Sequence, residues 1–182
     1  MNIPFLLLLS LLPAVLSSSS STSEGETKTA RLRSLTQQAF EESQGRSAAI
    51  TLDVDDYKEL IIKNPRPYHT FVLVSAPTAV CDVCGPIGVS FEKAAISHYM
   101  VDDEVFFVKL DAYNHRGFQR IHGLRSVPHL IHLHEDSKLK HKKASPEFRV
   151  AKEDTYHQKV LEPTVDELLG WMNAKTGEHV DA

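Results

Sequence analysis

Two cysteines, Cys81 and Cys84, are the residues of this chain whose type and spacing best suit a chemical reaction. The 182-residue sequence contains no other cysteine, so no third thiol competes for pairing. A disulfide across two intervening residues closes a very short loop and therefore stabilises a fold little. Both sulfurs can lie on one turn at the start of a helix, and this spacing suits reversible oxidation or half of a metal site.

The two sulfurs are expected to have different roles. Backbone N–H groups and the helix dipole stabilise a thiolate at a helix N-terminus, so we expect Cys81 to be the attacking sulfur. Cys84, one turn further in, is then the resolving thiol. Asp82 lies between them, and its carboxylate opposes ionisation of a neighbouring thiol, which predicts a mild activation. The alternative is an inert pair that faces solvent.

The sequence places a strand before the cysteine pair and a helix after it. Residues 68–75 form a near-continuous apolar run, which is typical of a strand covered on both faces. Residues 89–100 carry apolar side chains at helical spacing. Pro86 cannot donate the helical hydrogen bond back to Asp82, so a helix that begins only near Pro86 is the alternative, and it weakens the dipole argument. The later elements follow in order: a strand at 105–110 that ends at Asp111, a helix at 117–122, and a strand at 129–134 led by Val127 and Pro128.

The flanking regions supply further helices and one short strand. We expect an amphipathic helix over 30–42, ended by Gly45, then a strand over 48–52. Asp53 can cap a helix that runs to Lys63, and Thr164 can cap a last helix that runs to Lys175 and stops at Gly177. The polar stretch 135–147 is expected to form a solvated hairpin or loop, and a patch for polyanions is the alternative. Alternating strands and helices predict an α/β domain of three layers.

The first 29 residues differ in composition from the rest. Ten of the twelve residues at 5–16 are apolar and small polar residues follow, so residues 1–20 are predicted to be a signal peptide. A vestigial apolar N-terminus is the alternative, because no Lys or Arg precedes this run. We expect residues 21–29 to be a flexible linker and residues 30–182 to be the folded domain. In the secretory pathway a C-x-x-C pair can cycle between thiol and disulfide.

The order of a buried strand, C-x-x-C, a helix, a second strand and a strand led by Val-Pro resembles the thioredoxin fold. The resemblance implies a central mixed sheet, here with an N-terminal helical extension. It also implies that the Val127–Pro128 peptide bond is cis and lies against the cysteine pair.

Residues 30–180 resemble more closely the lumenal domain of the thioredoxin-like subunit of the eukaryotic oligosaccharyltransferase. The stretches that carry this resemblance are R-L-R-S-L at 31–35, N-P-R-P-Y-H-T-F-V-L-V at 64–74, C-D-V-C at 81–84, F-F-V-K-L-D at 106–111, S-V-P-H-L at 126–130 and E-L-L-G-W-M-N-A-K-T-G at 167–177. It implies a redox-active domain of the endoplasmic reticulum lumen that captures unfolded or nascent polypeptides for N-glycosylation, with oligosaccharyltransferase subunits as partners. No apolar stretch follows the last helix, so no membrane span is expected in this chain.

An acceptor polypeptide must be extended and unfolded, so its binding surface should offer apolar side chains and backbone groups. The residues that flank the predicted site fit this requirement. On the cysteine side they are Val80, Val83, Pro86 and Ile87, and on the proline side they are Val127, Pro128, His129 and Leu130.

Composition and the remaining residues argue against other classes of function. Twenty Lys and Arg against 24 Asp and Glu give a formal charge of −4, which does not favour binding of nucleic acid. No phosphate-binding glycine loop is present, and we expect no cofactor. His132 and His134 share one face of their strand and nominally complete a zinc site with the cysteines. We favour the alternative that they are surface or half-buried strand residues, with no metal bound.

Three functions therefore compete. The first is a lumenal oligosaccharyltransferase subunit whose C-x-x-C pair captures acceptor polypeptides, with thiol–disulfide oxidoreductase activity as an accessory to glycosylation. The second is a free thiol–disulfide oxidoreductase or isomerase of the secretory pathway. The third is a peptide-binding module without catalysis, whose cysteines stay oxidised or bind zinc.

Overall fold

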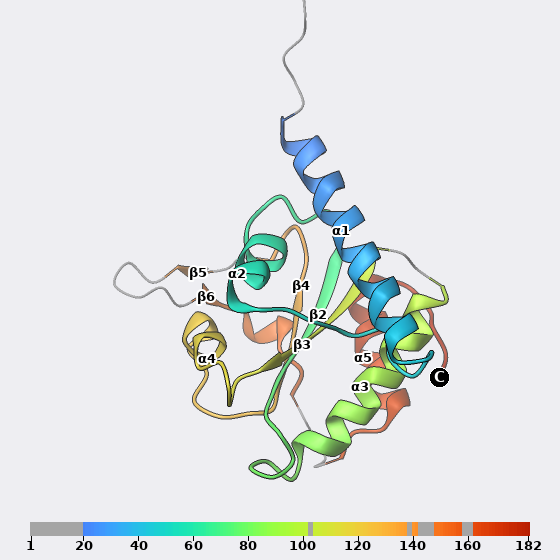
Figure 1. The fold of residues 1–182 in the computed structure, drawn as a ribbon, viewed down its shortest axis with the longest axis vertical. Coiled ribbons are helices and arrows are strands. Elements are labelled where there is room, and N and C mark those ends of the chain that lie inside the picture. The colour runs from blue at the N-terminus through green and yellow to red at the C-terminus, as the bar shows by residue number, and fades with distance from the viewer. Residues whose placement is uncertain (1–19, 102–103, 138–139, 142–147, 158–161) are drawn as a thin grey trace, which may run out of the picture.

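A mixed sheet of four strands, in the order β1-β3-β2-β4, forms the centre of the molecule. The computed structural model describes residues 20–101, 104–137, 140–141, 148–157 and 162–182 (Figure 1). The parallel strands are β1 (Ile50–Thr51), β2 (His69–Ser75) and β3 (Val105–Asp111), and β4 (His129–Leu133) runs antiparallel to β2. This arrangement confirms the α/β fold with a central mixed sheet.

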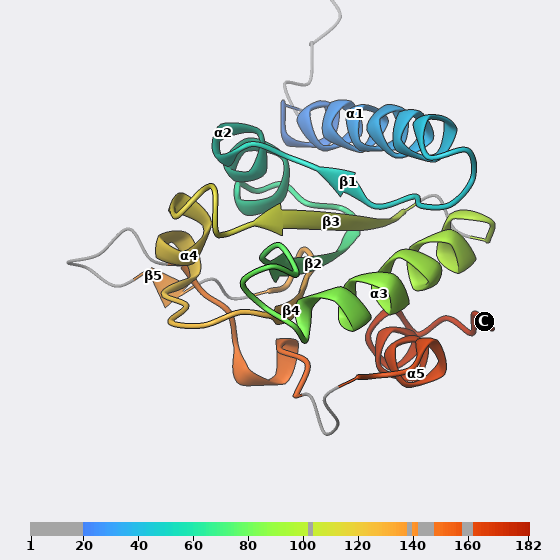
Figure 2. The ribbon, with the colours of Figure 1, turned by 60° about the horizontal axis from the view of Figure 1, so that its bottom comes forward.

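Helices cover both faces of the sheet and complete the three layers (Figure 2). One face is covered by α1 (Ser20–Glu42), α2 (Val54–Tyr57), its π-helical continuation η1 (Lys58–Ile62) and α4 (Gly117–His122). The other face is covered by α3 (Cys84–Tyr99) and α5 (Val165–Thr176). Each face has its own cluster of buried apolar side chains, so the sheet separates two hydrophobic cores.

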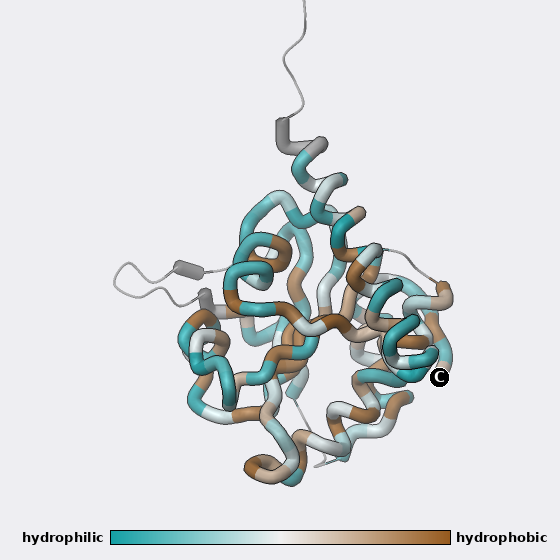
Figure 3. The backbone as a smooth tube through the Cα atoms, in the orientation of Figure 1, coloured by the Kyte–Doolittle hydropathy of each residue, from teal (hydrophilic) through white to brown (hydrophobic). Residues whose placement is uncertain are grey.

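The alternation of side chains along β2 explains the apolar run in the sequence. Val72 and Val74 belong to the core under α1 and α2, whereas Phe71 and Leu73 belong to the core under α3 and α5. All four side chains are fully buried, as expected for a strand covered on both faces. Figure 3 shows the strands as a predominantly hydrophobic interior.

The caps predicted from the sequence are present. One carboxylate oxygen of Asp53 accepts hydrogen bonds from the backbone N–H groups of Asp55 and Asp56, at 2.9 and 2.8 Å. Thr164 and Glu167 form a reciprocal capping box at the start of α5. Gly177 ends α5 in the left-handed conformation, with a φ of 79°, which glycine adopts without steric cost.

The N-terminal helix differs from the expectation of a flexible linker over 21–29, because α1 already begins at Ser20. Its first turns pack against the chain that leaves η1. The Lys28 ammonium donates a hydrogen bond to the Lys63 carbonyl oxygen at 3.0 Å, and the Lys28 residue is only 4% exposed. A tertiary contact of this kind leaves no trace in local composition, and the polar sequence therefore resembled a linker.

The predicted polar hairpin is described in part. Strands β5 (Lys140–His141) and β6 (Phe148–Arg149) pair antiparallel, as a hairpin requires. A short 3-10 helix, η2 (Lys152–Asp154), follows them. Residues 142–147, which complete the predicted polar stretch in the sequence, lie outside the described residues, as do residues 1–19 of the predicted signal peptide.

Candidate functional site

Cys81 and Cys84 form a disulfide in this structure, with an S–S distance of 2.01 Å and a Cα–Cα distance of 5.4 Å. The two residues differ in accessibility. Cys81 is partly exposed, whereas Cys84 is 3% exposed and begins α3. An incoming thiolate can therefore reach the Cys81 sulfur more readily than the Cys84 sulfur.

Backbone hydrogen bonds hold the loop between β2 and α3. The Pro77 carbonyl oxygen accepts from the N–H groups of Val80 and Cys81, at 3.0 and 3.2 Å. The Cys84 N–H donates to the Cys81 carbonyl oxygen at 3.0 Å, so a second turn leads directly into the helix. Pro86 lies in the first turn of α3, where an N–H group has no intrahelical partner, and proline is tolerated there.

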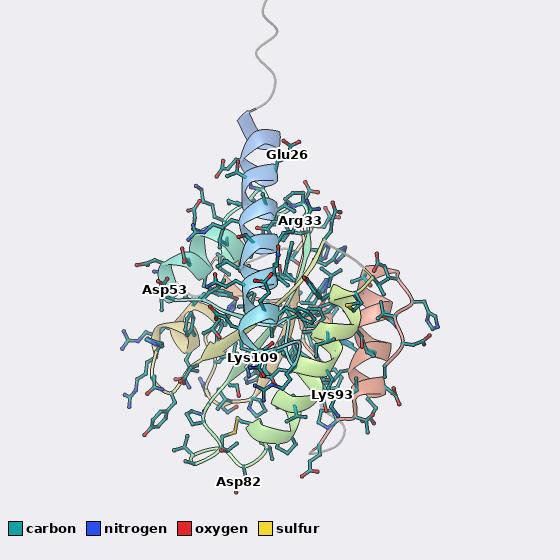
Figure 4. The ribbon with its side chains drawn as sticks, turned by 45° about the vertical axis from the view of Figure 1, so that its right-hand side comes forward. Glu26, Arg33, Asp53, Asp82, Lys93 and Lys109 are labelled. Carbon is teal, nitrogen blue, oxygen red and sulfur yellow. A yellow bond between two sulfur atoms is a disulfide. The ribbon has the colours of Figure 1, made fainter. Side chains whose placement is uncertain are left out.

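The charged residue between the two cysteines points away from the protein. Asp82 is exposed and lies at the tip of the molecule in Figure 4, at the opposite end from Glu26. A ligand that approaches the disulfide from this tip therefore meets a carboxylate, which disfavours anionic partners.

The proline-led strand starts at the same end of the sheet as the cysteine loop. The Val127–Pro128 peptide bond is cis, and His129, the first residue of β4, lies opposite Val74 near the end of β2. Val127, Pro128 and His129 are all partly buried. Burial lowers the pKa of His129, and the Ser126 hydroxyl lies 3.4 Å from His129 Nε2.

Two residues expected to contact a peptide are instead part of the core. Ile87 is 2% exposed and Leu130 is 1% exposed, and both pack between the sheet and the α3–α5 layer. The period of α3 turns Ile87 toward the sheet, and the alternation along β4 turns Leu130 toward α3. These two side chains therefore pack in the core beneath the site and are not available to contact a peptide. The remaining candidates, which are partly or largely exposed, are Val80, Val83, Pro86, Val127, Pro128 and His129.

A hollow of about 360 Å³ beside Cys84 was not foreseen in the sequence. It is bounded by the loop after β2, by the first turns of α3 and by β3. The Lys109 ammonium pairs there with the Glu92 carboxylate, and both side chains are about one-third exposed. One feature of the sequence could have indicated this hollow: Lys109 is a charged residue inside the apolar run of β3.

The close approach of the cysteine loop to α3 gives a testable expectation for Gly85. A Cβ atom at this position would lie 2.8 Å from Thr78 Cγ2, whereas nothing lies within 4 Å of a Cβ at Gly88. Thr78 is exposed and can turn its methyl group away at a rotamer cost, so Gly85→Ala should lower the free energy of unfolding of the oxidised protein by at most about 1 kcal/mol. Gly88→Ala is the matched control and should raise it by up to about 1 kcal/mol, since alanine favours a helix. Urea unfolding measures both, and equal stability of the two variants would contradict the contact.

The histidines discussed as zinc ligands lie at the other end of the sheet from the disulfide. His132 and His134 stack with each other and with His69 of β2, with ring centroids 5.1–5.8 Å apart; we name these three residues the histidine stack. His132 lies opposite Phe71 of β2. Phe71 comes four residues before Ser75, the last residue of β2, so His132 lies about 13 Å along the strand from the end that leads to the cysteines. A zinc site shared with the cysteines is therefore not formed in this structure.

Burial, with smaller contributions from His69, His134 and Lys175, lowers the pKa of His132 to about 3.

Comparisons with solved structures confirm the thioredoxin fold. The zinc-bound form of human ERp44 has a TM-score of 0.51 at 14% identity and covers 70% of this chain and 30% of that chain. Full-length ERdj5 has a TM-score of 0.51 at 14% identity, and the match covers 76% of this chain and 16% of that chain. The J-Trx1 fragment of ERdj5 has a TM-score of 0.50 at 12% identity, and the match covers 89% of this chain and 92% of that chain. At such identities these similarities establish the fold alone.

Sequence comparison identifies the family. A comparison with curated protein sequences gives no match. The family model described as "OST3 / OST6 family, transporter family" matches residues 37–182, which include the cysteine pair, the cis-proline strand and α5. None of the described helices combines the length and apolar character that a membrane crossing requires. Because the match covers well over half of its length, the chain belongs to the OST3/OST6 family.

Proposed function

We propose that this chain is a lumenal thioredoxin-like domain of the oligosaccharyltransferase, which captures acceptor polypeptides reversibly in the endoplasmic reticulum. The observation that carries the proposal is the unequal accessibility of the disulfide, with Cys81 partly exposed and Cys84 buried. Family membership supports the association with the oligosaccharyltransferase.

The disulfide can capture a client without any further oxidant. A client cysteine thiolate attacks the Cys81 sulfur, a new S–S bond forms between client and Cys81, and the Cys81–Cys84 bond breaks. Cys84 leaves as a thiolate and takes a proton from water. The return attack of the Cys84 thiolate on Cys81 restores the disulfide and releases the client thiolate. The cycle has no net redox change, so its effect is to prolong the contact between client and domain.

A non-covalent contact must bring the client to the sulfur. Val80 is 52% exposed beside Cys81, and Val127, Pro128 and His129 border the same end of the sheet. These side chains offer apolar area without a fixed hydrogen-bonding pattern, which suits many extended sequences. Each ordered side chain costs about 0.5–1.5 kcal/mol on binding, so we expect dissociation constants on the order of 10–1000 μM.

The test of complex membership is purification of the native gene product from membranes, followed by identification of its partners. Recovery with oligosaccharyltransferase subunits supports the proposal. Recovery without them, together with active disulfide exchange, identifies a free oxidoreductase of the secretory pathway instead.

Peptide capture is tested separately by NMR titration of the oxidised and the reduced protein with cysteine-free peptides. Chemical-shift changes should cluster at residues 80–86 and 126–129, and they should saturate in both redox states. Saturable binding confined to another surface, such as the paired strands β5 and β6, would exclude the proposed groove.

A further inference from the structure

A pairing outside the main sheet brings an acidic side chain to the histidine stack. Thr155 forms an antiparallel bridge with Ile131 of β4, and the Tyr156 N–H donates to the Leu130 carbonyl oxygen at 2.9 Å. Antiparallel pairing around this bridge puts Asp154 beside His132, and His134 follows His132 on the same face of β4. Three groups that are far apart in the sequence therefore meet on the sheet face that α5 covers.

The atoms of these three residues lie close enough to share one ion. One ring nitrogen of His132, one of His134 and one carboxylate oxygen of Asp154 all lie within 4.8 Å of one another. His132 is 1% exposed, and its Nδ1 has no hydrogen-bond partner among the described residues. A buried nitrogen without a partner is costly and needs an explanation. A bound cation supplies one.

We propose that His132, His134 and Asp154 form a binding site for a divalent transition-metal ion, of which Zn²⁺ fits best. Two imidazoles and a carboxylate are ligands that zinc accepts readily, whereas Mg²⁺ and Ca²⁺ require mostly oxygen. Ligand atoms around a tetrahedral zinc lie about 3.3 Å apart, given bonds of about 2.0–2.1 Å. Small side-chain rotations must therefore close the present spacing, and a fourth position stays open.

The surroundings of His132 fix its ring for this role. His132 Nε2 lies 2.9 Å from His69 Nδ1. When Nε2 carries the proton and donates it to His69, the lone pair of His132 falls on Nδ1, the nitrogen without a partner. A metal-binding histidine usually donates its other N–H group in this way. Phe71 stacks on the ring at 4.9 Å, and Trp171 meets it edge-on at 6.5 Å.

His134 must exchange one contact for another when a metal binds. Its Nδ1 accepts a hydrogen bond from the Asp136 backbone N–H at 3.2 Å, which leaves Nε2 for the metal. Coordination through Nε2 requires the tautomer with the proton on Nδ1, so the bond from Asp136 has to break. The amide resonance of Asp136 is therefore a specific reporter of metal binding.

Two charged features act on the site in opposite directions. The Lys175 ammonium donates a hydrogen bond to Asp154 Oδ1 at 3.1 Å and so competes with a metal cation for this carboxylate. A neighbouring hollow of about 340 Å³, by contrast, is lined by His69, His134 and the carboxylates of Glu104, Glu135 and Asp136. Carboxylates in a hollow raise the local concentration of cations, so this surface offers a route of entry.

The test is calorimetric titration of Zn²⁺ into the full chain in its oxidised form at pH 7.5. The disulfide keeps the cysteine sulfurs from binding, so a single saturable site is expected to come from the histidines. His134→Ala should weaken binding at least about tenfold. Lys175→Gln should tighten it, because the competing ammonium is removed. His179→Ala, at an exposed position, is the matched control and should bind as the wild type does.

The measurement has clear contrary outcomes. Equal affinities of His134→Ala and His179→Ala, no saturable Zn²⁺ binding, or equally tight Mg²⁺ binding would each overturn the proposal. Thermal unfolding without metal checks that His134→Ala is folded, and Asp154→Asn, also expected to bind more weakly, replaces it if it is not. In NMR spectra the Asp136 amide should shift on addition of Zn²⁺ and stay unchanged on addition of Mg²⁺. An Asp136 amide that ignores Zn²⁺ also contradicts the site.

Discussion

A Cys84→Ser variant will accumulate mixed disulfides with client peptides, whereas a Cys81→Ser variant will form none. In Cys84→Ser the accessible Cys81 thiolate attacks a client disulfide, forms a new S–S bond and releases the second client sulfur as a thiolate. The buried residue 84 then has no sulfur with which to resolve the adduct. In Cys81→Ser the remaining thiol belongs to a residue that is 3% exposed, out of reach of a polypeptide.

The experiment uses a peptide whose cysteine is joined to glutathione, with adducts separated on non-reducing gels and identified by mass spectrometry. The double variant Cys81→Ser with Cys84→Ser is the control for non-specific labelling. Wild-type protein that is reduced before the assay should show only transient adducts, since the Cys84 thiolate resolves them. Trapping by Cys81→Ser alone would reverse the assignment of the two sulfurs.

Replacement of Arg66 by methionine will lower the free energy of unfolding by about 3 kcal/mol or more. Arg66 is 1% exposed, and its guanidinium donates hydrogen bonds to the carbonyl oxygens of Ile61, Ile62 and Ser137 at 3.4, 3.0 and 3.2 Å. Methionine has a similar length but no donor, so these buried acceptors lose their partner, at about 1–3 kcal/mol each. Burial also lowers the pKa of Arg66, although it stays charged at neutral pH.

Chemical denaturation of the oxidised protein measures this loss. Arg125→Met, at an exposed position, is the matched control and should change stability by less than about 0.5 kcal/mol. Arg66→Lys should fall between the two, because a single ammonium cannot span the acceptors that the planar guanidinium reaches. A stable Arg66→Met variant would show that these carbonyl bonds contribute little.

The sequence was informative about the fold where local pattern and tertiary environment agree. The apolar run of β2 predicts a strand buried on both faces, and Asp53 and Thr164 predict helix starts, because a cap acts within three residues. The first turns of α1 could not be predicted in the same way. Lys28 there contacts the Lys63 carbonyl oxygen, and local pattern does not reveal a contact between residues 35 positions apart.

The candidate site was predictable to a similar extent. The C-x-x-C spacing and Val127–Pro128 placed the reactive pair and the strand that borders it. The pairing of Glu92 with Lys109 joins α3 to β3, so spacing alone does not reveal it. The approach of Asp154 to the histidine stack likewise follows from a single isolated bridge to β4, which has no periodic pattern in the sequence.

Both edges of the sheet offer little to an additional strand. Edge strand β1 has only two residues, and α1 packs over it. At the other edge the chain around Thr155 already bonds to β4 through the bridge and the Tyr156 N–H. An open edge invites pairing with any extended chain and can seed aggregation. In the capture of polypeptides proposed above, contact would take place at the tip that carries the disulfide, away from the few backbone groups that the sheet edges leave unpaired.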